Sequence, residues 1–477
     1  NYALGEKTGI VGGIDELGPA VTTTDNNSYS HNYGVESYLA RINYGFKSRY
    51  YIDASWRTDG SSRFHPSDRW GHFWSVGASW RISEEQFMEN TRQWLDNLTL
   101  KVSYGVQGND NLGTYYAWQG LYDYTWPNAT DAGAFVDKLE NRKVTWEKNG
   151  NLNAGIEATM FGGRLGVSVE YYNRKTRDML LNSPLPISTG FTGFNDNVGS
   201  LRNQGLEVSL RGTILDKRDF RWDATLMGSF NRNKVLSLTG GQDVITSGIR
   251  VIEVGRPIYT FYLPKTAGVD PATGKQLYYA YWTQTVNDEG TLVNTRCDEY
   301  ITDNVAMATL SKYYHESREP KLFGSIGSTF TILKNIDVSF LTTYSIGGWV
   351  YDGLYNGSMY VQYAGNNWHK NAKRRWQKPG DKTDVPMLEV GGSYATTSNS
   401  LIDASYFAIK NITVGYTLPK RWLKKIDIES LRIYATLDNI AMFNHMDGMD
   451  PQYNFTGSVA YSYTPSRVIA FGIDLNF

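Results

Sequence analysis

The chain has 477 residues, of which 41% are hydrophobic and 14% aromatic, and it includes 34 Tyr, 14 Trp and 47 Gly. A formal net charge of −1 gives no reason to expect a nucleic-acid partner. With a mean hydropathy of −0.44, the sequence has no apolar run near the roughly 20 residues that a membrane-spanning helix needs. The single cysteine, Cys297, excludes an internal disulfide and favours a bacterial envelope or the cytosol over a secreted eukaryotic protein.

Residues 1–34 are rich in Gly, Thr and Asn and show no sustained period, so we predict a loop. From there on, hydrophobic residues alternate with polar or small ones, which is the pattern of a strand with one apolar face. We predict about thirteen such strands, at approximately 38–44, 50–57, 74–82, 98–106, 152–161, 164–173, 204–214, 219–231, 320–332, 335–346, 405–417, 429–440 and 467–477.

The predicted connections alternate between short and long. The short ones are 45–49, 162–163, 215–218, 333–334 and 418–428, with 83–96 as a longer exception. The long ones are 58–73, 107–151, 174–203, 232–319, 347–404 and 441–466. Outer-membrane barrels have short periplasmic turns and long extracellular loops, whereas a soluble sandwich has no reason to place every long loop at one end. The sequence therefore predicts an all-β, antiparallel transmembrane β-barrel.

Charged residues fall mostly on the face opposite the apolar one, as a wet lumen requires. They are Arg41, Asp53, Arg57, Arg81, Lys101, Glu157, Glu170, Glu207, Arg211, Arg221, Asp223, Arg432, Asp438 and Asp474. In the last strand we expect Ile469, Phe471, Ile473, Leu475 and Phe477 to face lipid. About thirteen strands would leave an open edge in the membrane, where unpaired backbone groups are costly. We therefore expect this chain to be the C-terminal part of a larger barrel.

Several segments carry a family resemblance, in the same order as in the family. They include Arg57–Phe64 (RTDGSSRF), Arg69–Gly71 (RWG), Asn203–Glu207 (NQGLE), Gly268–Gly274 (GVDPATG) and Lys410–Pro419 (KNITVGYTLP). Together they resemble the SusC/RagA-type TonB-dependent transporters over nearly the whole chain. The resemblance implies a barrel of about twenty-two strands with a plug domain inside. Residues 1–477 would then supply its C-terminal ~13 strands, with long extracellular loops at about 107–151, 232–319 and 347–404, and without the plug and first strands.

The resemblance also implies a function and partners. It implies import of oligosaccharides, or of peptides in the RagA branch, across the bacterial outer membrane. A SusD-like surface lipoprotein would cap the barrel, and the TonB–ExbB–ExbD complex would drive import through the N-terminal part that this chain lacks. Outer-membrane lipid would surround the strands. A dimer of transporter–lipoprotein pairs is an arrangement that the resemblance leaves open.

Candidate cargo-binding residues are aromatics in two predicted extracellular loops, because flat rings can cover the apolar faces of sugars. They are Tyr115, Tyr116, Trp118 and Trp126 in one loop, and Trp349, Tyr360 and Trp368 in another. The alternatives are packing within the loops, contact with the lid, or membership of the outer aromatic girdle.

No catalytic or metal-binding pattern accompanies these residues. The sequence has no HxxxH, HExxH, Cys-x-x-Cys, P-loop, GxGxxG or GxSxG motif. The segment Gly108–Asn111 has oxygen ligands for Ca²⁺ but lacks EF-hand spacing, so we interpret it as a turn. We therefore predict a protein that is not an enzyme and uses no cofactor, metal or nucleic acid.

Two other functions remain open on the sequence. One is a passive channel or adhesin formed by a complete barrel of about fourteen strands, which would conduct without a proton-motive force. The other is a soluble β protein that binds or cleaves carbohydrate, which would be extracted without detergent.

Overall fold

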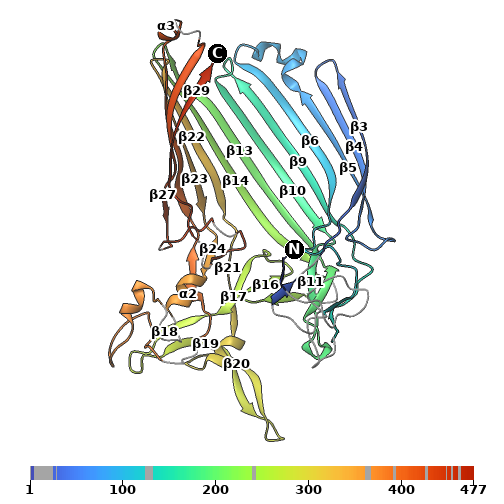
Figure 1. Ribbon diagram of the computed structural model, residues 1–477, viewed down its shortest axis with the longest axis vertical. Coiled ribbons are helices and arrows are strands. Elements are labelled where there is room, and N and C mark those ends of the chain that lie inside the picture. The colour runs from blue at the N-terminus through green and yellow to red at the C-terminus, as the bar shows by residue number, and fades with distance from the viewer. Residues whose placement is uncertain are drawn as a thin grey trace.

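The computed structural model describes residues 2–4, 25–27, 30–123, 133–238, 243–359, 367–389, 394–424, 428–446, 448–452, 455–459 and 463–477. Its main feature is an antiparallel sheet of thirteen strands, in which each strand pairs with the next strand of the sheet along the chain (Figure 1). These strands are β3 (Val35–Phe46), β4 (Tyr50–Ser61), β5 (Trp70–Arg81), β6 (Leu95–Asn109), β9 (Glu147–Met160), β10 (Leu165–Arg177), β13 (Ser200–Lys217), β14 (Phe220–Ser237), β22 (Leu322–Ile332), β23 (Ile336–Ile346), β26 (Tyr406–Thr417), β27 (Ser430–Asn444) and β29 (Val468–Asn476). The prediction of about thirteen antiparallel strands is confirmed.

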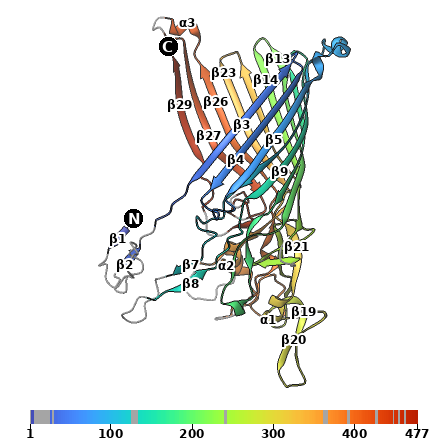
Figure 2. The same ribbon diagram turned by 90° about the vertical axis from the view of Figure 1, so that its right-hand side faces the viewer.

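The sheet is curved and open in the described part of the chain, with β3 at one edge and β29 at the other (Figure 2). Connections of 2 to 13 residues lie at the upper end in Figure 1, where α3 (Lys420–Leu423) and the C-terminus are found. The other six connections lie at the lower end, and the longest joins β14 to β22. Five of them are long, but the connection between β4 and β5 has only 8 residues, because both strands extend into the predicted long connection 58–73.

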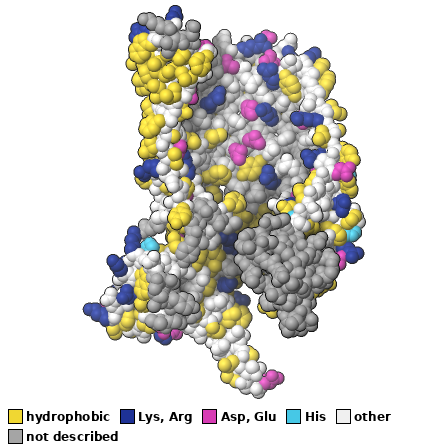
Figure 3. All heavy atoms as spheres, viewed as in Figure 1, with side chains coloured by type: hydrophobic (Ala, Val, Ile, Leu, Met, Phe, Trp, Pro, Cys, Tyr) yellow, Lys and Arg dark blue, Asp and Glu magenta, His cyan; other side chains and the backbone are white. Residues whose placement is uncertain are grey.

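The two faces of the sheet follow the alternation in the sequence. Outward residues are apolar and accessible, and Ile42 and Phe471 are 70% and 82% exposed. On the concave face, acidic and basic side chains are scattered over a hollow wall (Figure 3). The expected orientation of the last strand holds, because Asp474 forms an ion pair across the inner face with Arg432 on β27.

Two central strands are longer than expected. β13 and β14 each have 18 residues, whereas the alternation predicts 204–214 and 219–231. The additional residues at the lower end are mainly polar, such as Arg202 and Asn233, and they continue the ladder with paired backbone groups. Strand pairing therefore extends past the region in which lipid imposes an apolar face.

Tyrosines on the inner wall pack over glycines on the neighbouring strand. The directly opposed pairs on this wall are Tyr172 with Gly205 and Tyr434 with Gly472, and Tyr344 with Gly324 is a similar pair on the outward face. A Cβ atom added at Gly205 would lie 2.5 Å from the Tyr172 hydroxyl oxygen, so glycine is required for the ring to lie flat on the wall. Such pairs leave room for the strong curvature of the sheet.

The longer connections form small sheets of their own, which the sequence pattern did not predict. One comprises β15 (Val244–Ser247), β16 (Arg250–Glu253), β17 (Thr260–Pro264) and β21 (Lys312–Ser317), and another comprises β18 (Thr266–Val269), β19 (Gln276–Val286) and β20 (Leu292–Thr302). A third comprises β24 (Trp349–Asp352), β25 (Leu401–Asp403) and β28 (Ser458–Val459), and there are two-stranded pairs of β1 (Tyr2–Leu4) with β2 (Asp25–Asn27), β7 (Leu121–Asp123) with β8 (Phe135–Lys138), and β11 (Leu180–Pro184) with β12 (Gly193–Asn197).

The helices are short. They are α1 (Val305–Leu310), α2 (Gly353–Met359) and α3, with the 3-10 helices η1 (Ile82–Glu84), η2 (Gln86–Thr91), η3 (Ile187–Thr189), η4 (Lys370–Arg374) and η5 (Ser398–Ser400). Among the described residues, no helix is both long enough and apolar enough to cross a membrane.

Candidate functional site

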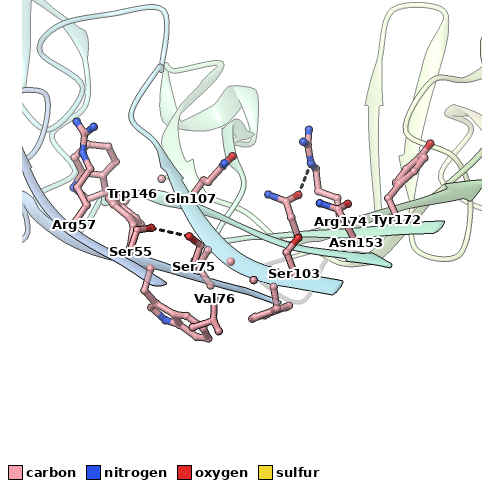
Figure 4. A pocket seen from close by; sticks show the side chains of 18 of the residues that line it. Ser55, Arg57, Ser75, Val76, Ser103, Gln107, Trp146, Asn153, Tyr172 and Arg174 are labelled. Carbon is pink, nitrogen blue, oxygen red and sulfur yellow. Dashed lines mark hydrogen bonds between the residues drawn. The ribbon is translucent and has the colours of Figure 1, made fainter. Parts of the chain in front are cut away.

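A cavity of about 1250 Å³ lies against the concave wall formed by β4 to β14. Polar side chains dominate its lining, and they include Asp53, Ser55, Arg57, Ser75, Ser103, Gln107, Asn151, Asn153, Glu170, Arg174, Asn203, Glu207 and Asn231. Ser55, Ser103 and Arg174 project to one side of the strands, while Val76 points away from them (Figure 4). The period-two alternation of each strand thus builds a wall rich in hydrogen-bonding groups.

Neighbouring side chains on this wall hold one another in place. The Ser55 and Ser75 hydroxyl oxygens are 2.6 Å apart (Figure 4). The Arg174 Nε donates to Asn151 Oδ1 at 2.6 Å, and the Tyr172 hydroxyl donates to Asn231 Oδ1 at 2.7 Å. The first two bonds join adjacent strands and the third spans from β10 to β14 across β13, so the polar groups are fixed by the sheet.

Two carboxylates on the wall face each other without a cation. Glu170 on β10 and Glu207 on β13 are directly opposed in the strand register, and both line the cavity. Neither forms an ion pair with another residue that the structure describes. Like charges directly opposite each other destabilise a sheet, so this position favours a positively charged group in the lumen.

A cluster of aromatic and charged residues borders the cavity at the lower end of the wall. We call Tyr33, Ser61, Arg63, Asp110 and Tyr115 the rim cluster. The Asp110 carboxylate accepts hydrogen bonds from the Tyr33 hydroxyl (2.9 Å), the Ser61 hydroxyl (2.7 Å) and Arg63 Nη1 (3.2 Å). The Arg63 guanidinium lies 4.6 Å from the Tyr33 ring centroid and 5.1 Å from that of Tyr115. Asp110 therefore orients Arg63 between the rings of Tyr33 and Tyr115. Asp110 belongs to the segment Gly108–Asn111, which we interpreted as a turn.

The other predicted aromatics of this loop lie near the rim cluster. The Tyr116 hydroxyl accepts a hydrogen bond from the backbone N–H of Asn32 at 2.9 Å. The Trp118 ring meets the His65 ring edge-on at 5.1 Å, and its buried Nε1 has no acceptor among the described residues. Trp118 also packs against the buried cluster of Phe64, Phe73, Ala117, Val144 and Trp146. Trp118 thus contributes to packing in the loop, which was one of the alternatives.

The remaining predicted residues lie elsewhere. Trp349 packs against the cluster of Phe261, Leu263, Tyr351 and Leu401, which come from strands of two of the small sheets. Trp368 is 38% exposed and lies beside Met359 and Ala372. Trp126 and Tyr360 are outside the described residues. None of the five predicted aromatics that the structure describes lines the cavity, and the two loops keep them in two separate groups.

An exposed aromatic from a distant segment reaches the cavity instead. Phe455 lies in the connection between β27 and β29, is 79% exposed, and lines the cavity. Its neighbours hold the segment: Arg250 Nη2 donates to Thr456 Oγ1 at 3.2 Å, and Arg318 Nη2 donates to the Pro451 carbonyl at 2.8 Å. Burial disfavours the charged guanidinium and so lowers the pKa of both Arg250 and Arg318, whose hydrogen bonds to this segment are to neutral acceptors.

A buried acid lies where the small sheets join the wall. The Glu319 carboxylate accepts a hydrogen bond from the backbone N–H of Asn233 at 3.1 Å, and burial raises the pKa of Glu319. Asn233 in turn accepts from the backbone N–H of Ile258 and donates to Asn203. Among the described residues, no group of three or more His, Cys, Asp or Glu side chains could hold a metal ion.

A family model for the TonB dependent receptor-like β-barrel matches residues 4–440. The chain belongs to this family. TonB-dependent receptor P26 of Formosa agariphila is 28% identical over 490 residues, which cover 96% of this chain and 47% of that protein. The TonB-dependent receptor SusC of Bacteroides thetaiotaomicron is 28% identical over 469 residues, covering 95% of this chain and 45% of SusC. The chain therefore spans about half the length of the curated relatives that it matches.

A solved structure gives the same result. The RagAB peptide transporter matches with a TM-score of 0.81 and 29% identity, over 97% of this chain and 50% of that one. The resemblance to SusC and RagA is confirmed, and so is the outer-membrane β-barrel. In TonB-dependent receptor barrels, as in other outer-membrane barrels, short turns face the periplasm and long loops face outward. The rim cluster and Phe455 then lie at the extracellular end, and α3 lies at the periplasmic end.

The sequence could have indicated only part of this arrangement. The alternation identifies the residues of the inner wall, and the RTDGSSRF segment contains both Ser61 and Arg63. Tyr33 lies in a stretch without period, and nothing in the sequence near Phe455 indicates a contact with a wall whose residues precede it by more than 220 positions. Such long-range contacts depend on the tertiary fold.

Proposed function

We propose that residues 1–477 form the C-terminal part of a plugged TonB-dependent transporter that imports oligosaccharides across the outer membrane. The observation that supports this proposal is the cavity on the inner wall, which combines hydroxyl, amide and charged side chains with aromatics at its extracellular end. Sugars present hydroxyl groups to such polar side chains and apolar faces to aromatic rings. The transporter has no enzymatic role in this proposal.

The proposal includes two protein partners. A SusD-like surface lipoprotein caps the extracellular end, and the TonB–ExbB–ExbD complex acts from the periplasmic side through an N-terminal part. Similarity to SusC and to the RagAB transporter supports this arrangement. The small sheets formed by the long connections provide an extended surface for such a lipoprotein.

Peptides are the second candidate cargo. The likeness to a structure described as a peptide transporter favours them. The inner wall carries both signs of charge, with Arg57 and Arg174 as well as Glu170 and Glu207, and could bind the termini and side chains of a peptide. The two cargo classes share a transport mechanism and differ in the groups that the wall must bind.

An uptake experiment tests the function and separates the cargoes. The complete gene is expressed in a bacterium from which it has been deleted, and labelled oligosaccharides and labelled peptides are supplied in parallel. We expect oligosaccharide uptake that stops when an uncoupler collapses the proton gradient. Uptake that continues with the uncoupler would contradict active import and favour a passive channel. Uptake of peptides alone would favour the second cargo.

Substitutions test the site. Trp118→Ala and Trp368→Ala are expected to weaken uptake while the barrel remains folded, and Trp422→Ala at the periplasmic end is the matched control. Because Trp118 also packs against a buried cluster, its variant is compared with Phe455→Ala, which removes an exposed ring without disturbing that cluster. Unchanged uptake in all three extracellular variants would contradict the site. Co-purification with a surface lipoprotein tests the partner separately.

A further inference from the structure

The connection between β5 and β6 differs from a simple periplasmic turn. It contains both η1 and η2, and it exposes large hydrophobic side chains. Phe87 on η2 is 67% exposed, and Trp94, just before β6, is 45% exposed. In Figure 2 the blue helical turns at the upper right lie beyond the ends of the strands. Leaving two such side chains in water is unfavourable, so the environment of this segment needs an explanation.

Hydrogen bonds hold this segment against the lipid-facing side of the barrel. The Glu85 Oε1 accepts from the Tyr50 hydroxyl at 2.5 Å and from Trp80 Nε1 at 3.1 Å, and Oε2 accepts from Arg49 Nη1 at 3.1 Å. The Tyr50 and Trp80 rings stack with centroids 6.4 Å apart, and both lie on the apolar outer face. Because Glu85 binds the polar groups of Tyr50 and Trp80, two aromatic residues of the lipid-facing surface, η1 and η2 lie at the edge of the lipid layer.

Other connections at the same end also expose large hydrophobic side chains. Phe161 and Leu333 are 53% and 61% exposed, and both adopt positive φ angles (61° and 51°), which bulky residues rarely do. The Phe161 backbone N–H donates to the Trp94 carbonyl at 2.8 Å, which joins two of these connections. Trp422 on α3 is 54% exposed and lies beside Arg421. Exposed apolar residues thus recur around the periplasmic end of the described strands.

We propose that Ile82–Trp94 is an interfacial anchor that lies in the plane of the periplasmic leaflet and contacts phospholipid. Phe87 and Trp94 enter the boundary between headgroups and acyl chains, and the exposed Arg92 lies among the phosphates. Continuity with the Tyr50–Trp80 pair of the lipid-facing surface favours lipid over a periplasmic protein as the occupant. The anchor concerns the membrane contact of the barrel and does not depend on the cargo.

Site-directed fluorescence tests the proposal with the full-length transporter in vesicles of phosphatidylethanolamine and phosphatidylglycerol. Cys297 and any cysteine outside residues 1–477 are replaced by serine, and an environment-sensitive dye is attached to Phe87→Cys or Trp94→Cys. The matched control is Glu89→Cys, which labels an exposed polar position on the same short helix. Electrophoretic mobility before and after heating confirms that each labelled barrel is folded.

We expect the dye at positions 87 and 94 to emit at shorter wavelength than the dye at position 89, and to be quenched more strongly by brominated lipid. Equal emission and equal quenching at all three positions would overturn the proposal. Because these vesicles hold no periplasmic protein, a protein-binding segment would also give this negative result, and a shift restored by periplasmic extract would identify that alternative.

Discussion

Arg432 joins three strands of the inner wall near the periplasmic end. Its Nε and Nη2 donate to the two oxygens of Asp337 on β23 at 3.0 and 2.7 Å, and its Nη1 donates to Asp474 on β29 at 3.2 Å. β29 is an edge strand within the described sheet, so the ion pair adds to its ladder with β27. Arg432→Leu removes both ion pairs and leaves two neighbouring carboxylates without a cation.

The expected magnitude follows from the exposure of each partner. Arg432 and Asp337 side chains are each 29% exposed, and a bidentate, charge-assisted pair of this kind contributes about 1.5–3 kcal/mol. Asp474 is 55% exposed, so its pair adds only about 0.2–1 kcal/mol. Arg432→Leu should therefore lower the free energy of unfolding by about 2–3 kcal/mol. Lysine keeps the charge but not the planar fork, so Arg432→Lys should restore part of the loss.

Urea unfolding of the full-length barrel in detergent measures this effect, with folded and unfolded forms separated by electrophoretic mobility. Asp337→Asn completes a double-mutant cycle with Arg432→Leu, and we expect a coupling energy of about 1–2 kcal/mol. The reasoning is refuted if Arg432→Leu unfolds at the same urea concentration as the unchanged protein. It is also refuted if the two substitutions are additive, because the geometry requires that each removes the same interaction.

Three further predictions concern the wall and its loops. Glu170→Gln should stabilise the full-length barrel by about 0.2–1 kcal/mol in the same urea assay, because it relieves the repulsion from Glu207, and a loss of stability would show that a cation is already bound. Burial raises the pKa of Glu319 above its ordinary 4.5, so the folded state binds the proton more tightly than the unfolded state. The free energy of unfolding should therefore fall as pH rises from 4.5 through the raised pKa. Hydrogen exchange of the long connections between about pH 4 and 8 measures this dependence, and Glu319→Gln should abolish it. Gly472→Val should destabilise the last strand by about 1–3 kcal/mol, since its Cβ would overlap the Tyr434 ring, and normal thermal stability of that variant would contradict the packing.

The strands could be predicted from the sequence because lipid and water impose opposite demands on alternate residues. The segment from Arg467 to Phe477 illustrates this, as its apolar residues face outward and Asp474 reaches Arg432 on the inner face. The lower ends of β13 and β14 were not predicted, since no lipid faces that part of the wall. There, backbone pairing continues with residues that have no regular hydrophobic period, so the strand boundary leaves no signal in the sequence.

The site was less predictable because its parts meet only in the folded chain. Aromatic density directed attention to the segment with Tyr115 and Trp118, but it could not distinguish a ring that joins the rim cluster from one that packs inside the loop. Asp110 shows the same limit, since its sequence context indicates a turn while its carboxylate orients Arg63. Phe455 reaches the cavity from the far end of the chain through bonds made by Arg250 and Arg318.

The two faces of the sheet tolerate different amino-acid substitutions. A residue such as Ile42 must remain apolar because it faces lipid, whereas Ser55 or Asn153, on the inner wall, can change without affecting membrane contact. A shift of register by one residue would exchange these faces, and the Tyr172–Gly205 pair opposes such a shift because only glycine fits beneath the ring. The barrel can therefore change the polar groups that it presents to cargo while its position in the membrane is retained. The proposed anchor at Phe87 and Trp94 belongs with the lipid-facing residues, so substitutions there should alter membrane contact and leave the choice of cargo unchanged.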